Sequence, residues 1–160
     1  FEIQGGETYN TGVKASWFVT PRLTLTGSYY RGYTKGQAFE ADLLKTSDLV
    51  SESFAFDANY KVSKQTEFGF NVSSPLRVVD GSLAVNLPSG RDNYSDTVYF
   101  NRYQAALKPE AREYKFAAYA SHNFSENLSL RSELDVRVNP EHQRQANDYR
   151  ALLGLNWTFN

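Results

Sequence analysis

The stretch LSLRSELDVRV, residues 128–138, decides the fold class. Every second residue from Leu128 onward is apolar, with Ser132 the single interruption, and the residues between them are polar or charged. Successive side chains of a β-strand point to opposite faces, so a strand separates these two sets completely. An α-helix would scatter the same charges around its circumference. The stretch therefore predicts an amphipathic β-strand.

The same alternation recurs along the chain. Residues 149–159 place tyrosine, alanine, two leucines, tryptophan and phenylalanine on one face. Residues 115–124 and 54–62 repeat the pattern with phenylalanine and alanine on the apolar side. The remaining strands expected on these grounds are residues 13–19, 23–33, 68–78, 82–87 and 97–107.

The connections between these strands are of two kinds. Short polar turns are expected at residues 20–22, 63–65 and 125–127, each joining two strands into a hairpin. Longer connections are expected at residues 34–47 and 139–147. Within the first of these, the apolar pair Leu43 and Leu44 indicates brief helical character. Short turns at one end and long loops at the other are typical of outer-membrane barrels.

Composition narrows the function classes. The 160 residues have the length of one ordinary domain, and we expect a single domain over residues 1–160 that forms the C-terminal part of a longer precursor. The chain contains no cysteine, so it carries no disulfide, thiolate metal site or cysteine nucleophile. A net charge of -1 gives no general attraction for nucleic acid, and no nucleic-acid partner is expected. No apolar run approaches the ~18 residues of a transmembrane helix, but a closed barrel crosses a membrane with strands that are only half apolar.

A soluble barrel or sandwich also alternates apolar and polar residues, so alternation alone leaves two kinds of all-β protein open. Three features favour the membrane. The longer expected strands have about 11–13 residues, whereas soluble strands average about 5–6 and tilted membrane strands need about 9–11. Aromatic residues such as Trp17, Tyr33 and Tyr149 gather near strand ends, as at a membrane interface. The chain also ends on an alternating aromatic strand, which resembles the signal read by the barrel-assembly machinery of the outer membrane.

We therefore predict an all-β fold, an antiparallel up-and-down transmembrane β-barrel of about 8–10 strands. The nine expected strands make an odd number, whereas bacterial single-chain barrels have even numbers. Either residues 1–8 add a strand, or the region around Asp80 and Gly81 divides differently, or strands come from outside this chain.

The two faces of the strands define the candidate site residues. The apolar face is expected to contact lipid through Phe54, Phe56, Leu128, Leu130, Leu134, Val136, Leu153 and Leu155. The polar face is expected to line the barrel interior with Asp57, Lys61, Lys115, Arg131, Glu133, Asp135, Arg137 and Arg150. The assembly signal is expected to comprise Tyr149, Leu153, Leu155, Trp157 and Phe159.

The polar face admits two interpretations. Its charges line an open pore, or they neutralise one another in a small barrel whose interior is filled by side chains, and the second is favoured. A lipid-modifying hydrolase would need a serine close to His122 or His142, and no serine–histidine spacing stands out. These two histidines also lie too far apart in sequence for a plausible metal site. We expect no enzymatic activity, no metal and no cofactor.

Several segments resemble a known family. SPLRVVDGSLAVNLP (residues 74–88), LKPEARE (107–113) and VSESFA (50–55) resemble the C-terminal region of a group of subtilisin-like serine peptidases from Gram-negative bacteria. The resemblance covers residues 23–159 in order and spacing. It implies an autotransporter-like outer-membrane barrel whose peptidase lies upstream, and none of the peptidase motifs occurs in this chain.

These observations lead to one expectation about function and leave two alternatives. We expect a membrane anchor or translocator, in the bacterial outer membrane, for an N-terminal passenger that the resemblance suggests is a subtilisin-like peptidase. Its expected partners are outer-membrane lipid, the barrel-assembly machinery, and the passenger or further strands of the same protein. The alternatives are a small lipid-modifying enzyme and a soluble β-domain that binds a partner.

Overall fold

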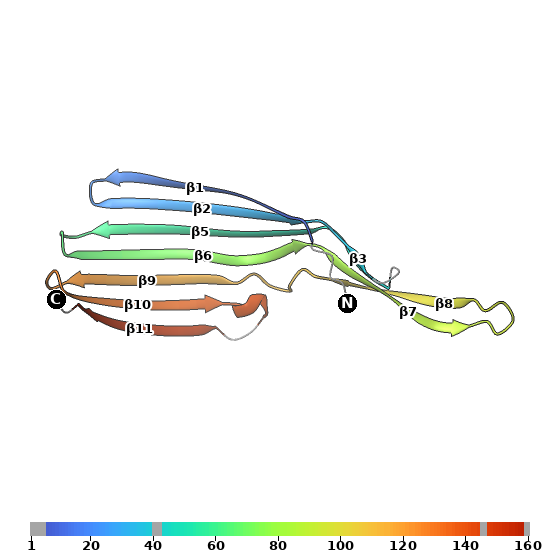
Figure 1. Cartoon of the computed structure of the whole chain (residues 1–160). Coiled ribbons are helices and arrows are strands. Elements are labelled where there is room, and N and C mark those ends of the chain that lie inside the picture. The colour runs from blue at the N-terminus through green and yellow to red at the C-terminus, as the bar shows by residue number, and fades with distance from the viewer. Residues whose placement is uncertain (1–5, 40–42, 145–146, 159–160) are drawn as a thin grey trace. The chain divides into compact units, whose positions relative to one another are not determined.

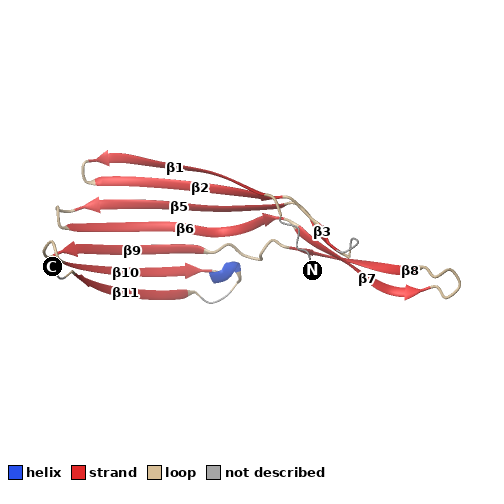
Figure 2. Cartoon of the chain, in the orientation of Figure 1, coloured by secondary structure: helices blue, strands red, loops and turns tan. Residues whose placement is uncertain are grey.

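The computed structural model describes residues 6–39, 43–144 and 147–158 of the chain. This part is all-β and built from antiparallel pairs, which confirms the all-β, antiparallel part of the predicted fold, whereas the closed transmembrane barrel stays a prediction (Figures 1 and 2). The helical element in it is a single 3-10 turn, η1 (Pro140–His142). None of the described residues belongs to a helix of the length and apolarity that would carry it through a bilayer.

The strands form two sheets. The main sheet has seven strands in the order β1-β2-β5-β6-β9-β10-β11, and the second sheet has four in the order β3-β4-β7-β8. The main-sheet strands are β1 (Thr8–Thr20), β2 (Leu23–Thr34), β5 (Leu49–Lys61), β6 (Thr66–Asp80), β9 (Tyr114–Asn123), β10 (Leu128–Val138) and β11 (Asp148–Trp157). The second-sheet strands are β3 (Ala38–Phe39), β4 (Leu44–Thr46), β7 (Ser82–Arg91) and β8 (Val98–Ala106).

This topology corrects two sequence-based expectations. The predicted strands 82–87 and 97–107 form, as β7 and β8, a hairpin in the second sheet and do not continue the main meander. The predicted helical character near Leu44 is also wrong: Leu44 begins β4, where it pairs with Val85 of β7. A neighbouring strand satisfies the backbone of this short segment, and that outweighs its local helical preference. Residues 40–42 lie outside the described residues.

The three predicted short turns are confirmed, and each uses a hydroxyl side chain. The Thr20 hydroxyl accepts hydrogen bonds from the backbone N–H groups of Arg22 and Leu23, and β2 follows at once. Ser63 likewise accepts from the N–H groups of Gln65 and Thr66. Ser125 performs the same role in the turn between β9 and β10. These hydrogen bonds pair backbone N–H groups at the turn, and they thereby stabilise the reversal of the chain.

The register of the last strands keeps the two faces separate. β10 pairs with β11 so that Leu130 lies opposite Leu155, and Asp135 lies opposite Arg150. The β6–β9 pair is antiparallel as well, and it places Gly69 opposite Tyr119. A Cβ atom on Gly69 would overlap the Tyr119 ring, so this position needs glycine for the ring to lie flat across the strand. The alternation read from the sequence is therefore an alternation across one sheet.

The described chain divides into two compact units. The larger comprises residues 12–30, 53–76 and 110–160, and the smaller comprises residues 1–11, 31–52 and 77–109. The buried apolar residues among those described are three alanines: Ala84 in the smaller unit, and Ala111 and Ala117 in the larger. Leucine, isoleucine, valine and phenylalanine ordinarily fill protein interiors. In the described part of the chain, the large apolar side chains are therefore exposed or half-buried and none is fully buried.

Candidate functional site

The apolar face of the larger unit is the first candidate site. It gathers the predicted lipid-facing residues, which alternate with polar residues on each strand. Leu134 is 64% exposed, Leu153 76% and Leu155 66%. Phe56 is also exposed, whereas Phe54, Leu128, Leu130 and Val136 are half-buried on the same strands.

In this region of the sheet, leucines are exposed and an aspartate is buried, which is the reverse of the usual pattern in soluble proteins. Asp135 is 3% exposed, although it lies directly between Leu134 and Val136 in the sequence. Burying a leucine side chain ordinarily stabilises a fold by about 1.5–3 kcal/mol, and burying a charge costs free energy unless partners surround it. Leaving leucines exposed while covering an aspartate is therefore unfavourable for a protein surrounded by water.

The charged face of β9, β10 and β11 explains how Asp135 is tolerated. The Nε atom of Arg150 lies 2.6 Å from Oδ2 of Asp135, and Nζ of Lys115 and Nε of Arg137 each lie 4.0 Å from its carboxylate oxygens. Three cations from three adjacent strands thus surround one carboxylate whose side chain is 1% exposed. Coulombic attraction and charge-assisted hydrogen bonds offset the desolvation of this group.

Glu133 extends this network along the same face of β10. Its Oε1 lies 3.3 Å from an Arg150 nitrogen and 3.4 Å from Nζ of Lys115, and its Oε2 lies 3.6 Å from an Arg131 nitrogen. The Glu133 side chain is 18% exposed, whereas that of Arg131 is 63% exposed. The network brings together six of the eight residues predicted to line the barrel interior. It contains two more cations than carboxylates.

The other two predicted interior residues, Asp57 and Lys61, lie on β5, outside this network. Asp57 accepts a hydrogen bond from the Asn71 side-chain amide at 2.7 Å. Tyr119 joins the two regions, because its hydroxyl bonds the Asn59 side chain and its ring lies 5.1 Å beneath the Arg131 guanidinium. Sequence reasoning missed Asn59, Asn71 and Tyr119. The sequence feature that could have identified them is that each alternates with the apolar residues of its strand, as the predicted interior residues do.

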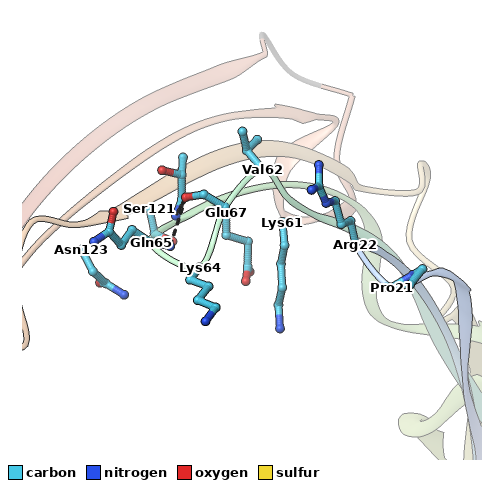
Figure 3. Close-up of a pocket in the computed structure, with 11 residues that line it drawn as sticks. Pro21, Arg22, Lys61, Val62, Lys64, Gln65, Glu67, Ser121 and Asn123 are labelled. Carbon is cyan, nitrogen blue, oxygen red and sulfur yellow. Dashed lines mark hydrogen bonds between the residues drawn. The ribbon is translucent and has the colours of Figure 1, made fainter.

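Lys61 borders a hollow of about 620 Å³ at the short-turn end of the larger unit. Lys61, Lys64 and Glu67 extend from the same side of the β5–β6 turn in Figure 3. Arg22 from the β1–β2 turn and Asn123 from β9 complete its polar rim. The hollow is open and lined mostly by polar and charged side chains. It offers a wet, polar mouth and no enclosed site for a small molecule.

The C-terminal strand presents the predicted assembly residues in one row. Tyr149, Leu153, Leu155 and Trp157 alternate along β11, and they are 75%, 76%, 66% and 61% exposed. Trp157 pairs with Leu128 at the start of β10. Phe159 lies outside the described residues. The arrangement leaves a continuous apolar row at one edge of the main sheet, because β11 is its last strand.

The two histidines do not assemble a hydrolytic site. Nδ1 of His122 lies 2.8 Å from the Thr66 hydroxyl. Nδ1 of His142 accepts from the backbone N–H of Glu113, and its Nε2 lies 3.1 Å from the Leu76 carbonyl oxygen. None of these partners is a serine. Within the described ranges, no group of three histidine, aspartate or glutamate side chains is arranged to hold a metal ion.

Comparison with known proteins adds no relative: no family model, curated protein or solved structure matches this chain. The resemblance to subtilisin-like peptidases therefore remains a prediction that rests on the quoted segments alone. The exposure of the leucines and the burial of Asp135 in the main sheet are the observations that bear on function.

Proposed function

We propose that this chain forms part of the wall of an outer-membrane β-barrel that anchors or translocates an N-terminal passenger domain. The observation that carries the proposal is a set of exposed leucines on one face of the main sheet and a buried carboxylate on the other. Leu134, Leu153 and Leu155 are exposed, whereas Asp135 on the opposite face is almost fully covered by cations. Lipid is the surroundings in which this distribution is favourable, because it removes the leucines from water.

The dimensions of the strands support the same proposal. The main-sheet strands have between 10 and 15 residues. At about 3.3 Å per residue, a strand of ten residues spans roughly 33 Å, and a tilt of about 40° reduces this to roughly 25 Å. That is about the height of the apolar band of an outer-membrane barrel. Trp17, Tyr149 and Trp157 near strand ends suit its aromatic borders.

The strand number indicates that the wall is completed by further strands. In an antiparallel meander of seven strands, the outer strands β1 and β11 run in the same direction. Direct pairing of these two strands would be parallel, and seven is below the about eight strands of the smallest barrels. Unpaired backbone groups in lipid cost several kcal/mol each, so neither edge can remain open. We infer an odd number of additional strands from elsewhere in the same protein, which makes the total even.

The proposed passenger is a subtilisin-like peptidase, because residues 74–88 and 107–113 resemble the C-terminal region of such peptidases. A soluble β-domain is disfavoured because it would cover the Leu134 face and expose Glu133, whose side chain is 18% exposed. A hydrolase is disfavoured by the ring partners of His122 and His142.

Spin labels on two neighbouring leucines test the membrane proposal. Leu153 lies on the apolar face of β11, and Leu152 lies on the opposite face, across from Glu133. In the full protein inserted in a bilayer, a label at position 153 should be accessible to oxygen and shielded from a polar relaxation reagent. A label at position 152 should show the reverse preference. Equal accessibility to the polar reagent at both positions would overturn the proposal.

A further inference from the structure

His142 occupies a position that neither the charge network nor the apolar face explains. It ends η1, in the connection between β10 and β11, and it is half-buried. Its backbone carbonyl accepts from the N–H of Ala111, and its Nδ1 accepts from the N–H of Glu113 at 3.0 Å. Its Nε2 lies 3.1 Å from the carbonyl oxygen of Leu76 in β6. One side chain therefore ties three separated segments of the larger unit together.

These partners dictate a single protonation state of the ring. An N–H group only donates, so Nδ1 must be unprotonated to accept from Glu113. A carbonyl oxygen only accepts, so Nε2 must carry the hydrogen that it donates to Leu76. The ring is thus a neutral imidazole with both nitrogens in use. A second proton would have to occupy Nδ1, where it would face the Glu113 N–H, and that hydrogen bond would be lost.

The charged groups nearest to the ring come from three segments of the larger unit. The segment before β9 contributes Glu110, Arg112 and Glu113, and the Glu113 carboxylate already accepts from the Glu141 N–H at 2.8 Å. The Arg112 guanidinium lies over the Phe54 ring. The connection itself contributes Glu141 and Arg144, while β6 contributes the Leu76 carbonyl, followed in sequence by Arg77.

The connection is held in a conformation that depends on these bonds. Asn139, Glu141 and His142 have φ values of 52°, 56° and 60°, in the left-handed region that non-glycine residues avoid. Asn139 also donates to the Arg112 carbonyl oxygen through its side chain. Such a backbone persists only while the surrounding bonds hold it, so loss of one bond favours local opening.

His122 provides the contrast within the same unit. Its Nδ1 faces the Thr66 hydroxyl at 2.8 Å, and a hydroxyl either donates or accepts after a rotation. Protonation of His122 therefore preserves this contact, whereas protonation of His142 breaks one.

We propose that His142 is an acid-released latch that fastens residues 139–143 to residues 110–113 and to Leu76 in β6. The neutral imidazole bridges Glu113 and Leu76. Its protonation disengages Glu113 and loosens residues 139–143, while the strands of the sheet remain paired. This inference does not depend on the membrane proposal.

Amide hydrogen exchange on the full chain, folded in detergent micelles, tests the latch. After correction for the intrinsic effect of pH, exchange in residues 110–113 should accelerate about tenfold between about pH 7.5 and about pH 5. His142→Gln removes the titrating group and should abolish this dependence on pH. His122→Gln is the matched control, and it should retain the full response. Unchanged protection in the wild type, or a response that survives in His142→Gln, would overturn the latch.

Nitrogen NMR of the wild-type protein gives a test that does not require a His142 variant to fold. The chain has two histidines, so the ring signals of His142 are readily assigned with the His122→Gln protein. At neutral pH the chemical shifts should report hydrogen on Nε2 of His142. Hydrogen on Nδ1 at neutral pH would contradict the bond from Glu113 and exclude the latch.

Discussion

At the scale of single residues, environment decides what each position contributes. Leu152 and Leu153 are neighbours of the same type, yet Leu152 lies across from Glu133 and Leu153 lies across from Ser132 on the apolar face. The pair separates the effect of location from the effect of residue type.

Arginine substitution of these two leucines should give different losses of stability. On the membrane proposal, Leu153→Arg places a charge against lipid and should cost about 2–4 kcal/mol if the site is near the bilayer midplane. Leu152→Arg places the same charge near Glu133 and should cost much less. Urea unfolding of the full protein in lipid vesicles measures both, and equal losses would argue against a lipid-facing position for Leu153.

Asp135 and Arg131 form a second residue-scale comparison. Asp135→Asn leaves Arg150, Lys115 and Arg137 without their shared carboxylate, and breaking such a buried pair should cost about 3–5 kcal/mol. Arg131→Gln removes an exposed cation, 3.6 Å from Glu133, and should cost less than about 1 kcal/mol. The same unfolding measurement compares them. A larger loss for Arg131→Gln would show that Asp135 is not the centre of the network.

At the scale of elements, side-chain hydrogen bonds hold residues between strands, where the strand ladders provide no backbone partner. Asp48, between β4 and β5, accepts from the Tyr33 hydroxyl at 2.5 Å and from the Gly36 N–H at 2.8 Å. The hydrogen bond from Tyr33, then that from Gly36, and the nearby charge of Lys35 lower the pKa of Asp48 below its usual value of 3.8, against a smaller opposing effect of burial. Because these hydrogen bonds favour the ionised carboxylate of Asp48, its protonation at low pH should weaken them.

Acid should therefore loosen the residues that Asp48 holds, Tyr33 and Gly36 among them. A lowered folded-state pKa means that the carboxylate stabilises the fold fully above the ordinary aspartate pKa, and that this contribution is lost as the pH falls through the lowered value. Hydrogen exchange in residues 33–37 and 46–48, measured between about pH 5 and about pH 2, should show this loss. Asp48→Asn should show weaker protection at the higher pH and no further change. Protection that is indifferent to the substitution would refute the role of Asp48.

The terminal strand β11 carries the prediction about assembly. Replacing Trp157 and Phe159 with serine removes two aromatics from the end of the chain while sparing the ion pair of Arg150 with Asp135. If this strand is read by the assembly machinery, outer-membrane levels should fall while synthesis continues, which fractionation and immunoblotting would measure. Tyr149→Ser at the other end of β11 is a control for general loss of aromatic area. Normal membrane levels of the double variant would exclude an assembly role.

At the scale of the whole molecule, the central question is how the edges of the main sheet are satisfied. The chain lacks cysteine, so engineered disulfides report pairing without interference. Leu134→Cys with Ala151→Cys joins direct partners in the β10–β11 ladder and is the positive control. Ala15→Cys with Ala151→Cys joins β1 to β11. In the full protein we expect the control pair to cross-link efficiently. The pair at positions 15 and 151 should not cross-link, because the inferred additional strands lie between the edge strands β1 and β11.

An efficient cross-link between positions 15 and 151 within one molecule would establish a closed seven-stranded wall. That outcome would refute the inferred additional strands and leave the assignment of the apolar face to lipid open to the spin-label test.

The sequence by itself determined the long strands, their alternating apolar and polar faces and their short turns, but not the short strands β3 and β4. Alternation and hydroxyl-initiated turns are local, since a side chain's face depends on its parity and Thr20 or Ser63 bonds residues two and three positions ahead. This is why residues 128–138 alone predicted a polar set that includes Glu133 and Asp135.

Only the tertiary structure decided which strands share a sheet and which charges meet. Nothing in the alternation of residues 82–87 distinguishes a place beside β6 from a place beside β4, because pairing depends on segments distant in the sequence. For the same reason the sequence listed Lys115, Asp135 and Arg150 as members of one face without showing that they touch. Their contacts follow from the register of β9, β10 and β11, which brings Arg150, 15 positions after Asp135, to 2.6 Å from its carboxylate and Lys115, 20 positions before it, to 4.0 Å.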